Sequence, residues 1–143
     1  MKSNIKYILL LCSICFSVGA QTLDVHISNI RNGKGVLCVA VFANQIGFSA
    51  EKELFAVKCS KANIQNGELR VQIPISKGNY GISVLDDENE SGKMEYKFKC
   101  FPAEGFGFSD YYHKGIKKPV FDDFDFVVEQ DEIKIIKVRM KYF

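Results

Sequence analysis

The sequence predicts an all-β protein: an antiparallel β-sandwich of about seven to eight short strands, immunoglobulin-like or similar, after an N-terminal signal peptide. Apolar and polar residues alternate along most of the chain, and Gly, Asn and Pro separate the alternating segments. No convincing amphipathic helix follows residue 20. A closed barrel of similar strand number is the alternative.

Residues 1–20 have the organisation of a cleaved signal peptide. Lys2 and Lys6 form a basic start, Tyr7–Val18 is an apolar run, and small residues lead up to Ala20. The apolar run is shorter than the roughly 20 residues that a membrane-spanning helix needs. We therefore expect an exported protein, periplasmic or extracellular, with no membrane span after cleavage.

Residues 21–143 are expected to form a single domain, because their length suits one modest core. The chain has 19 basic and 17 acidic residues, and residues 1–20 remove two lysines, leaving 17 against 17. A formally neutral domain argues against nucleic-acid and membrane-surface partners, since both require a basic face.

The first strand is expected over residues 22–30, where every second residue from Leu23 to Ile27 is apolar. The RNGKG segment at residues 31–35 has hairpin-turn residues and predicts a direct hairpin to the next strand. That strand, residues 36–42 (VLCVAVF), is apolar on both faces, which is typical of a central strand.

Residues 44–52 are predicted to be a polar loop. A short strand is expected over residues 54–59, and another over residues 68–75 (ELRVQIPI). Pro74 cannot donate a backbone hydrogen bond, so the latter strand ends there or lies at a sheet edge. Residues 79–85 (NYGISVL) alternate again.

The later elements are less regular. A short strand is expected over residues 94–98, and residues 100–119 are read as one long aromatic, glycine-rich loop. Residues 124–128 and 133–143 alternate as strands. The best helix candidate, residues 51–62, is weakened by its β-branched and aromatic residues.

Three stretches resemble a known family: KGNYGISVLDDENESGKME, FPAEGFGFSD and KPVFDDFDFVV. Their order and spacing resemble the uncharacterised secreted bacterial family called domain of unknown function 2141, across essentially all of residues 21–143. The resemblance implies a sandwich similar to the transthyretin-like or carboxypeptidase-regulatory-like group, and no established activity. Ser91 stands where the family pattern has Asn, and Glu95 where it has Asp.

The acidic stretch DDENESGKME, residues 86–95, has the spacing of a calcium-binding loop. Calcium prefers six to eight oxygen ligands from alternate positions of a loop with a Gly at its bend. The candidate ligands are Asp87, Asn89, Ser91, the Lys93 carbonyl and Glu95. Phe98 stands where an EF-hand has its bidentate Glu, and the alternative is a plain Asx-stabilised turn.

The aromatic stretch between residues 106 and 113 is a candidate for binding a glycan, a small ligand or a partner protein. Its candidate residues are Phe106, Phe108, Ser109, Asp110, Tyr112 and His113. The alternative is that Phe106 and Phe108 close one end of the sandwich.

No catalytic motif is evident, and we expect that the protein is not an enzyme. Ser109, Asp110 and His113 lie close together in sequence, but the GFGFSD stretch lacks the G-x-S-x-G nucleophile elbow. A hydrolase is therefore only a remote alternative. No cofactor other than Ca²⁺ is indicated.

Three cysteines follow residue 20. Cys38 and Cys59 lie in strands joined by one loop, so we hypothesise a disulfide between them with Cys100 free. The function expected from the sequence is that of a secreted or periplasmic binding or structural module, with an unknown protein or glycan partner in the cell envelope.

Overall fold

A computed structural model describes residues 21–143, so the signal peptide expected over residues 1–20 lies outside the described residues. The elements in order are β1 (Gln21–Ser28), β2 (Val36–Phe42), α1 (Gln45–Ser49), β3 (Phe55–Ser60), η1 (Lys61–Asn63), β4 (Leu69–Ile75), β5 (Gly78–Asp87), β6 (Tyr96–Lys97), β7 (Phe101–Pro102), β8 (Gly105–Phe108), η2 (Phe121–Asp123), β9 (Asp125–Val128) and β10 (Ile133–Arg139). Within this part of the chain, no helix is long and apolar enough to cross a membrane.

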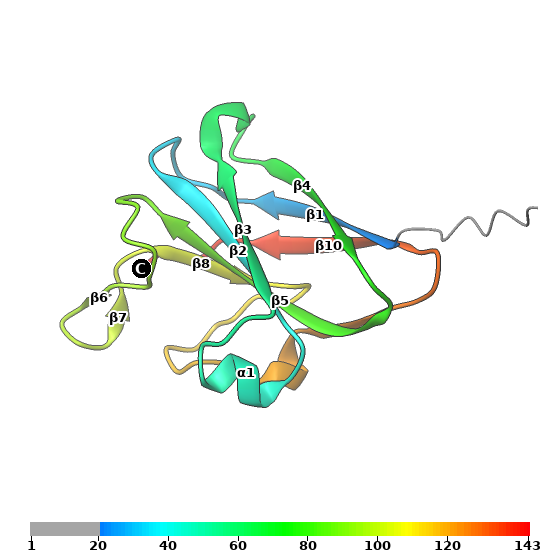
Figure 1. The fold of residues 1–143 in the computed structure, drawn as a ribbon. Coiled ribbons are helices and arrows are strands. Elements are labelled where there is room, and N and C mark those ends of the chain that lie inside the picture. The colour runs from blue at the N-terminus through cyan, green and yellow to red at the C-terminus, as the bar shows by residue number, and fades with distance from the viewer. Residues whose placement is uncertain (1–20) are drawn as a thin grey trace, which may run out of the picture.

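The fold is a β-sandwich, as the alternation predicted (Figure 1). One sheet has the order β10-β1-β4, and the facing sheet has the order β3-β2-β5-β8, with β9 paired to the first part of β5. The two strands β6 and β7 form a separate small hairpin. All pairings of the two main sheets are antiparallel except β1 with β10, which run parallel although they lie at opposite ends of the described chain.

The core lies between the two sheets, and the alternation identified its residues correctly. Apolar side chains from both inner faces are almost completely buried: Leu23, Val25, Ile27, Ile73, Ile136 and Val138 from one sheet, and Leu37, Val39, Val41, Ile82 and Val84 from the other. Burial of this apolar surface is the main force that holds the sheets together.

The strands before and after RNGKG, β1 and β2, do not pair with each other, contrary to the sequence prediction. The segment does not form a hairpin: it carries the chain from β1 in one sheet to β2 in the other. The prediction failed because turn residues indicate a change of direction and do not identify the pairing partner. The central position of β2, between β3 and β5, and the edge position of Pro74 in β4 are both confirmed.

One side of the sandwich is joined by backbone hydrogen bonds between β8 and the residues that follow β10. The backbone amide of Phe106 donates to the Lys141 carbonyl (3.0 Å), and the Lys141 amide donates back (2.7 Å). At the opposite side β3 and β4 are both edge strands, and no pairing joins them in the described residues. The molecule is therefore a sandwich and not a closed barrel.

Two segments expected to be loops contain regular structure. The polar stretch 44–52 includes α1, which begins because the Asn44 side chain accepts a hydrogen bond from the Gly47 amide (2.9 Å). The long segment 100–119 contains β8, which pairs with β5. Glycine usually indicates a loop, but Gly105 and Gly107 of β8 have a packing role.

Gly105 and Gly107 allow other residues to pack directly on the inner face of β8. A Cβ atom at Gly105 would lie 2.1 Å from the Tyr142 ring, and one at Gly107 would lie 2.6 Å from Val138 Cγ1. Phe106 and Phe108 therefore carry the side chains of this strand, and both lie on its outer face, where Phe108 is buried.

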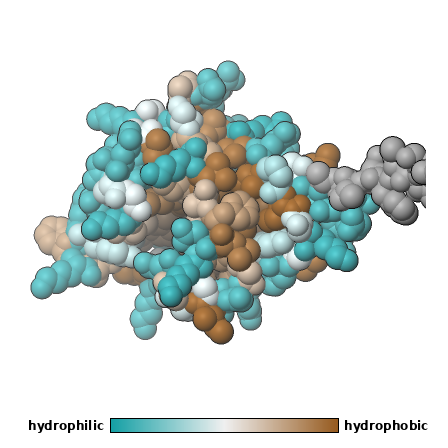
Figure 2. Space-filling view, viewed as in Figure 1, coloured by the Kyte–Doolittle hydropathy of each residue, from teal (hydrophilic) through white to brown (hydrophobic). Residues whose placement is uncertain are grey.

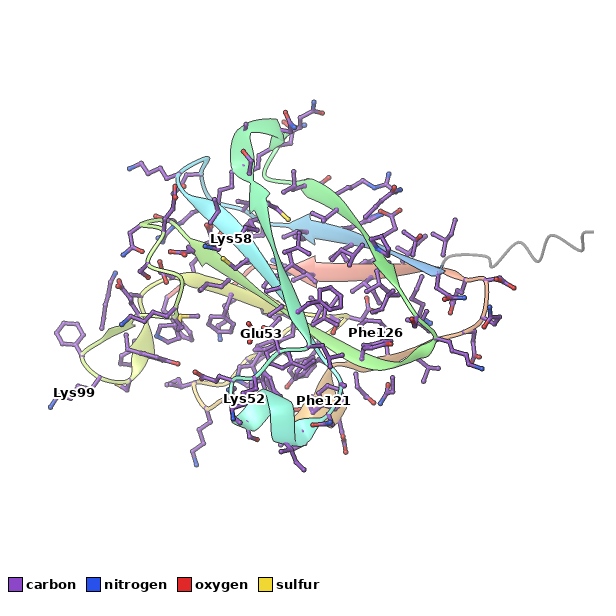
Figure 3. All side chains as sticks on the ribbon, viewed as in Figure 1. Lys52, Glu53, Lys58, Lys99, Phe121 and Phe126 are labelled. Carbon is purple, nitrogen blue, oxygen red and sulfur yellow. The ribbon has the colours of Figure 1, made fainter. Side chains whose placement is uncertain are left out.

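A second, aromatic cluster covers part of the outer face of the five-stranded sheet. It contains Phe42, Phe48, Phe108, Phe121 and Phe124, whose neighbouring rings mostly meet edge to face. Figure 3 shows Phe121 beside α1, and its backbone amide donates to Gln45 Oε1 (2.6 Å). This cluster explains why β2 is apolar on both faces.

Candidate functional site

The sheet groove, a cavity of about 500 Å³, lies on the outer face of the five-stranded sheet. Its floor consists mainly of small or apolar side chains from β2, β3 and β5: Cys38, Ala40, Ala56, Ser83 and Leu85. Because these side chains are short, the sheet surface there is hollow. Figure 2 shows this hollow between the β6–β7 hairpin and α1.

The walls of the sheet groove are aromatic and come from segments distant in sequence. Phe48 of α1, Phe106 and Phe108 of β8 and Tyr96 of β6 line it, together with His113. Phe48 and Phe108 belong to the buried aromatic cluster, and Phe106 packs against it. The walls are therefore held by the core of the protein on one side.

Charged side chains surround the sheet groove, and most are basic. Lys58, Lys93, Lys117 and Lys118 line it, against Glu51 and Glu53. Lys118 Nζ lies 3.3 Å from Glu51 Oε1 and 4.4 Å from the centre of the Phe48 ring. Over residues 21–143, no carboxylate lies within ion-pair distance of the other three lysines. Figure 3 shows Lys58 on β3 and Glu53 just before that strand.

The structure separates the six candidates of the aromatic stretch into two groups. Phe106, Phe108 and His113 line the sheet groove. Ser109, Asp110 and Tyr112 do not: Tyr112 is exposed and packs under the Arg139 guanidinium, 4.9 Å from the ring centre.

Ser109 and Asp110 bind the backbone of neighbouring strands. The Ser109 hydroxyl donates to the Phe124 carbonyl (2.5 Å) and accepts from the Ile82 amide (2.9 Å). Asp110 Oδ1 accepts from the Lys137 amide (2.9 Å). Within the described chain no acid or histidine side chain contacts the Ser109 hydroxyl, so these residues hold strands together.

His113 is held by its own segment. Its Nε2 lies 2.5 Å from the Lys117 carbonyl, and its Nδ1 lies 3.4 Å from the Tyr111 hydroxyl. The Lys117 contact requires a proton on Nε2, since a carbonyl can only accept. His113 is thus a wall residue of the sheet groove with both ring nitrogens engaged.

The acidic loop (Asp86–Glu95) is organised around Asp87, which is fully buried. The Ser91 amide donates to Asp87 Oδ1 (2.9 Å), and the Gly92 amide donates to Oδ2 (2.8 Å). Gly92 has φ +78°, the left-handed conformation that glycine adopts most easily. The Asx turn expected as the alternative is therefore present.

The other candidate ligands lie in the same loop. Asn89 Oδ1 also accepts from the Ser91 amide (3.1 Å), and the Asn89 amide group donates to Glu95 Oε2 (3.0 Å). The Ser91 hydroxyl donates to the Lys93 carbonyl (3.1 Å). A chain of hydrogen bonds thus connects all five residues within one compact turn.

Glu104, which the sequence analysis missed, is a buried acid beside this loop. It is only 6% exposed, and no hydrogen bond of normal geometry reaches either carboxylate oxygen. Burial raises the pKa of Glu104, and the negative charges of Asp87 and Glu95 raise it further, while the nearby Glu95 and Glu88 amides oppose the shift. No local sequence signal identifies Glu104, because its burial depends on contacts with the acidic loop.

No three His, Cys, Asp or Glu side chains of residues 21–143 already stand at the spacing of a bound metal. Asp87 directs its oxygens at loop amides, and Glu95 contacts Asn89. A cation at the acidic loop therefore requires side-chain rotation, which the half-buried Glu95 permits.

A separate buried ion pair lies inside the sandwich. Lys61 Nζ contacts Asp86 Oδ1, and both side chains are fully buried. Lys61 also donates to the Lys34 carbonyl (2.6 Å), and the Tyr142 hydroxyl donates to Asp86 Oδ2 (2.7 Å). Burial raises the pKa of Tyr142, and its bond to the Asp86 carboxylate adds to that increase.

The hypothesised disulfide is not present: Cys38, Cys59 and Cys100 are all free. Cys38 lies opposite Lys58, whereas Cys59 lies opposite Leu37, so the two thiols point to opposite faces of the sheet. Cys59 faces the core and Cys38 the sheet groove. Burial raises the pKa of both thiols.

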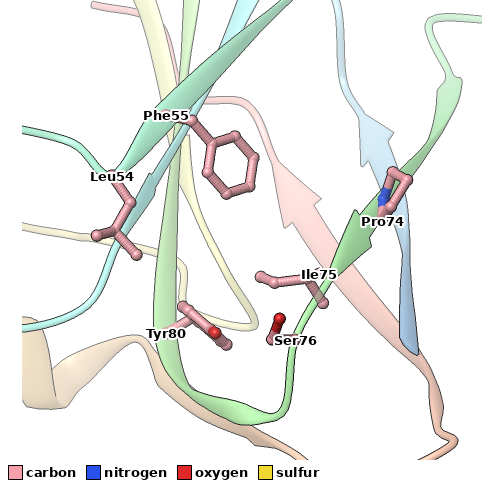
Figure 4. Close-up of a pocket in the computed structure, with 6 residues that line it drawn as sticks. All are labelled: Leu54, Phe55, Pro74, Ile75, Ser76 and Tyr80. Atoms are coloured by element: carbon pink, nitrogen blue, oxygen red, sulfur yellow. The ribbon is translucent and has the colours of Figure 1, made fainter. Parts of the chain in front are cut away.

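A second, smaller cavity of about 410 Å³ lies between the edge strands β3 and β4 (Figure 4). Its lining residues are Leu54, Phe55, Pro74, Ile75, Ser76 and Tyr80. Two hydroxyls are its only polar side-chain groups. It offers no charged group that would orient a ligand.

Comparison with known proteins adds one match. A family model described as "Uncharacterized protein conserved in bacteria (DUF2141)" matches residues 25–136. No curated protein and no solved structure matches the chain.

Proposed function

The chain belongs to this family of uncharacterised bacterial proteins, and we propose that it is an exported binding module whose ligand occupies the sheet groove. The sheet groove itself is the observation that carries the proposal. Its volume of about 500 Å³ falls within the range of small-molecule sites, roughly 300–1,000 Å³.

The ligand is a small molecule with an apolar body and an acidic group. The floor and walls are mostly apolar, so an apolar body gains from leaving water. Lys58, Lys93 and Lys117 have no carboxylate partner among residues 21–143, so they are free to attract an anionic group. A glycan fits less well, because the floor offers few hydrogen-bonding groups.

Export is part of the proposal, and the signal-like residues 1–20 support it. The absence of enzymatic activity is also proposed. The support is that the Ser109 hydroxyl is committed to backbone groups and that both ring nitrogens of His113 already have partners. A hydrolase would need these groups free and in contact.

Calcium stabilisation of the acidic loop is proposed as a second property of the module. Asp87 accepts hydrogen bonds from the fifth and sixth residues of the D-x-N-x-S-G turn, and this turn keeps the oxygens of Asn89, Lys93 and Glu95 in the same short loop, where a cation could replace their present partners. Affinity is expected near 10⁻⁴ to 10⁻³ M, the order of magnitude of extracellular modules. Calcium at about a hundredfold excess over Kd would then raise stability by about 2.7 kcal/mol.

The ligand proposal is tested with the fluorescent probe anilinonaphthalene sulfonate, which has an aromatic body and an anionic group. Ala56 lies exposed on β3 in the floor, so Ala56→Phe should fill the sheet groove without disturbing the core. We expect saturable binding to the wild type and binding weaker by about tenfold, equal to 1.4 kcal/mol, in Ala56→Phe.

Val127→Phe is the matched control, because Val127 is exposed on β9, outside the sheet groove. It adds a ring of the same size at another exposed strand position and should bind the probe like the wild type. Equal binding by Ala56→Phe and the wild type would exclude the sheet groove as the site.

A further inference from the structure

Glu104 is the one acid near the acidic loop whose carboxylate oxygens both lack a hydrogen bond. A buried carboxylate is costly, because burial removes water, and the nearby Glu88 and Glu95 amides replace that water only in part. Elsewhere in the described chain, the buried acids have hydrogen-bond or ion-pair partners: Asp86 is paired with Lys61, and Asp87 with two backbone amides. Glu104 therefore needs a separate explanation.

The position of Glu104 is set by the backbone on both sides. The preceding amide, that of Ala103, donates to the Glu95 carbonyl (2.7 Å), which places this turn against the end of the acidic loop. The following residue, Gly105, is paired with Asp86 in the sheet. Glu104 thus stands between the two ends of the acidic loop, although it is not part of it.

The carboxylates of Glu104 and Asp87 lie on the same side of the sheet. Asp86 and its partner Gly105 face the inside of the sandwich, so their neighbours Asp87 and Glu104 both face outward. No lysine or arginine is paired with Glu104, Asp87 or Glu95 in the described residues. Asp87 and Glu104 therefore lie on one side of the sheet beside the acidic loop, with no cationic side chain of the described residues paired to them.

We propose that Glu104 is a ligand of a Ca²⁺ ion held between the acidic loop and the start of β8. Asp87, Asn89, the Lys93 carbonyl and Glu95 supply oxygen atoms from the loop, and Glu104 supplies the carboxylate that an EF-hand loop takes from its twelfth position. The inference rests on the proposed calcium stabilisation and adds the remote ligand that the loop lacks.

Calcium is the cation that suits these groups. All of the donors are oxygens of mixed type, from carboxylates, an amide and a backbone carbonyl, and such a set suits the variable geometry of Ca²⁺ better than the strict octahedron of Mg²⁺. Sulfur and nitrogen ligands that would favour zinc do not contribute. The ion would connect the acidic loop to β8, whose Phe106 and Phe108 line the sheet groove.

The test compares Ca²⁺ binding, measured by titration calorimetry and by the Ca²⁺-induced increase in melting temperature, in the wild type and in Glu104→Gln. The substitution keeps the shape of the side chain and removes its charge. We expect Ca²⁺ binding weakened by an order of magnitude or more, since affinity follows the number of charged ligands. Glu104→Asp, which keeps the charge but shortens the reach, should also bind more weakly.

Glu129→Gln is the control, because Glu129 is exposed and distant in sequence from the site. It should bind Ca²⁺ like the wild type. A wild type that shows no calorimetric binding and no change in melting temperature in millimolar Ca²⁺ would refute the calcium proposal itself. A wild type that responds, together with Glu104→Gln and Glu104→Asp variants that respond equally, would refute the role of Glu104 and leave calcium at the loop.

Discussion

The hydroxyl of Tyr142 donates a 2.7 Å hydrogen bond to Oδ2 of Asp86, although 56 residues separate the two. Because Asp86 also contacts Lys61, this bond joins the end of the chain to β5 and η1 inside the sandwich. A second contact supports it: the Arg31 amide donates to the Tyr142 hydroxyl (3.2 Å). The buried charges are thus satisfied by groups from four distant segments.

Lys61→Met is expected to destabilise the fold by about 3–5 kcal/mol, because it leaves Asp86 as a buried, unpaired charge. Tyr142→Phe removes one hydrogen bond and should cost about 1.5–3 kcal/mol, as for bonds to charged groups. Urea unfolding measures the free energy of unfolding of both variants. The double variant Lys61→Met with Asp86→Leu should recover much of the loss, and no recovery would argue against the ion pair as the cause.

Asp87→Ala should abolish the calcium response and also lower stability when calcium is chelated. The loss of stability without calcium is expected because Asp87 accepts hydrogen bonds from two loop amides. Loss of a charged acceptor should cost about 1.5–3 kcal/mol. Thermal melts with calcium and with chelator separate the two effects, and an unchanged melting temperature in chelator would contradict the observed turn.

Gly92→Ala isolates the backbone requirement of the acidic loop. A Cβ atom at Gly92 would meet nothing within 4 Å, so only its φ of +78° opposes the substitution. The expected cost is about 1–2 kcal/mol. Gly33→Ala is the matched control, since that glycine also has open space and no positive φ. Equal stability of the two variants in chemical denaturation would show that the loop adapts.

The three thiols should react with an alkylating reagent in the order of their exposure. Cys100 is exposed and should react first, Cys38 is half-buried with a raised pKa and should react slowly, and Cys59 should react only on unfolding. Mass spectrometry of alkylated peptides follows each site. Protection of Cys38 by the sulfonate probe would place the probe in the sheet groove, whereas a Cys38–Cys59 peptide pair would contradict the structure.

Asp24 should contribute stability that is lost in acid. Its pKa is lowered from 3.8, first by a hydrogen bond from Arg70 (2.6 Å) and then by His26, whose Nε2 lies 3.2 Å from Asp24 Oδ2. A lowered pKa means that this stabilisation is complete above pH 3.8 and disappears as pH falls through the lower, folded-state value. Asp24→Asn should therefore be less stable than the wild type at neutral pH and approach it as the pH falls through the lower, folded-state pKa of Asp24.

The comparison of Asp24→Asn with the wild type is made by urea unfolding at a series of pH values. Arg70→Met should reproduce the same loss, because it removes the main cause of the lowered pKa. A difference between the variants and the wild type that does not change with pH would mean that packing, and not ionisation, explains their lower stability.

The sequence by itself determined where most strands lie and which of their faces are buried. Alternation is a local property with a period of two, so Leu23, Val25 and Ile27 could be assigned to one buried face without knowing what covers them. The edge position of Pro74 followed from its missing amide hydrogen. The acidic loop and its Asx turn were also readable, since side chain and backbone interact there within a few residues.

Only the tertiary structure decided which strands pair and which acids are left without partners. The parallel pairing of β1 with β10 and the separate sheets on either side of RNGKG depend on contacts between distant segments, about which turn residues carry no information. Glu104 looks like any exposed glutamate in the sequence, and its burial follows from packing of the β7–β8 turn against the acidic loop. The sheet groove exists for the same reason, because short side chains on three strands leave a hollow only when distant aromatic segments surround it.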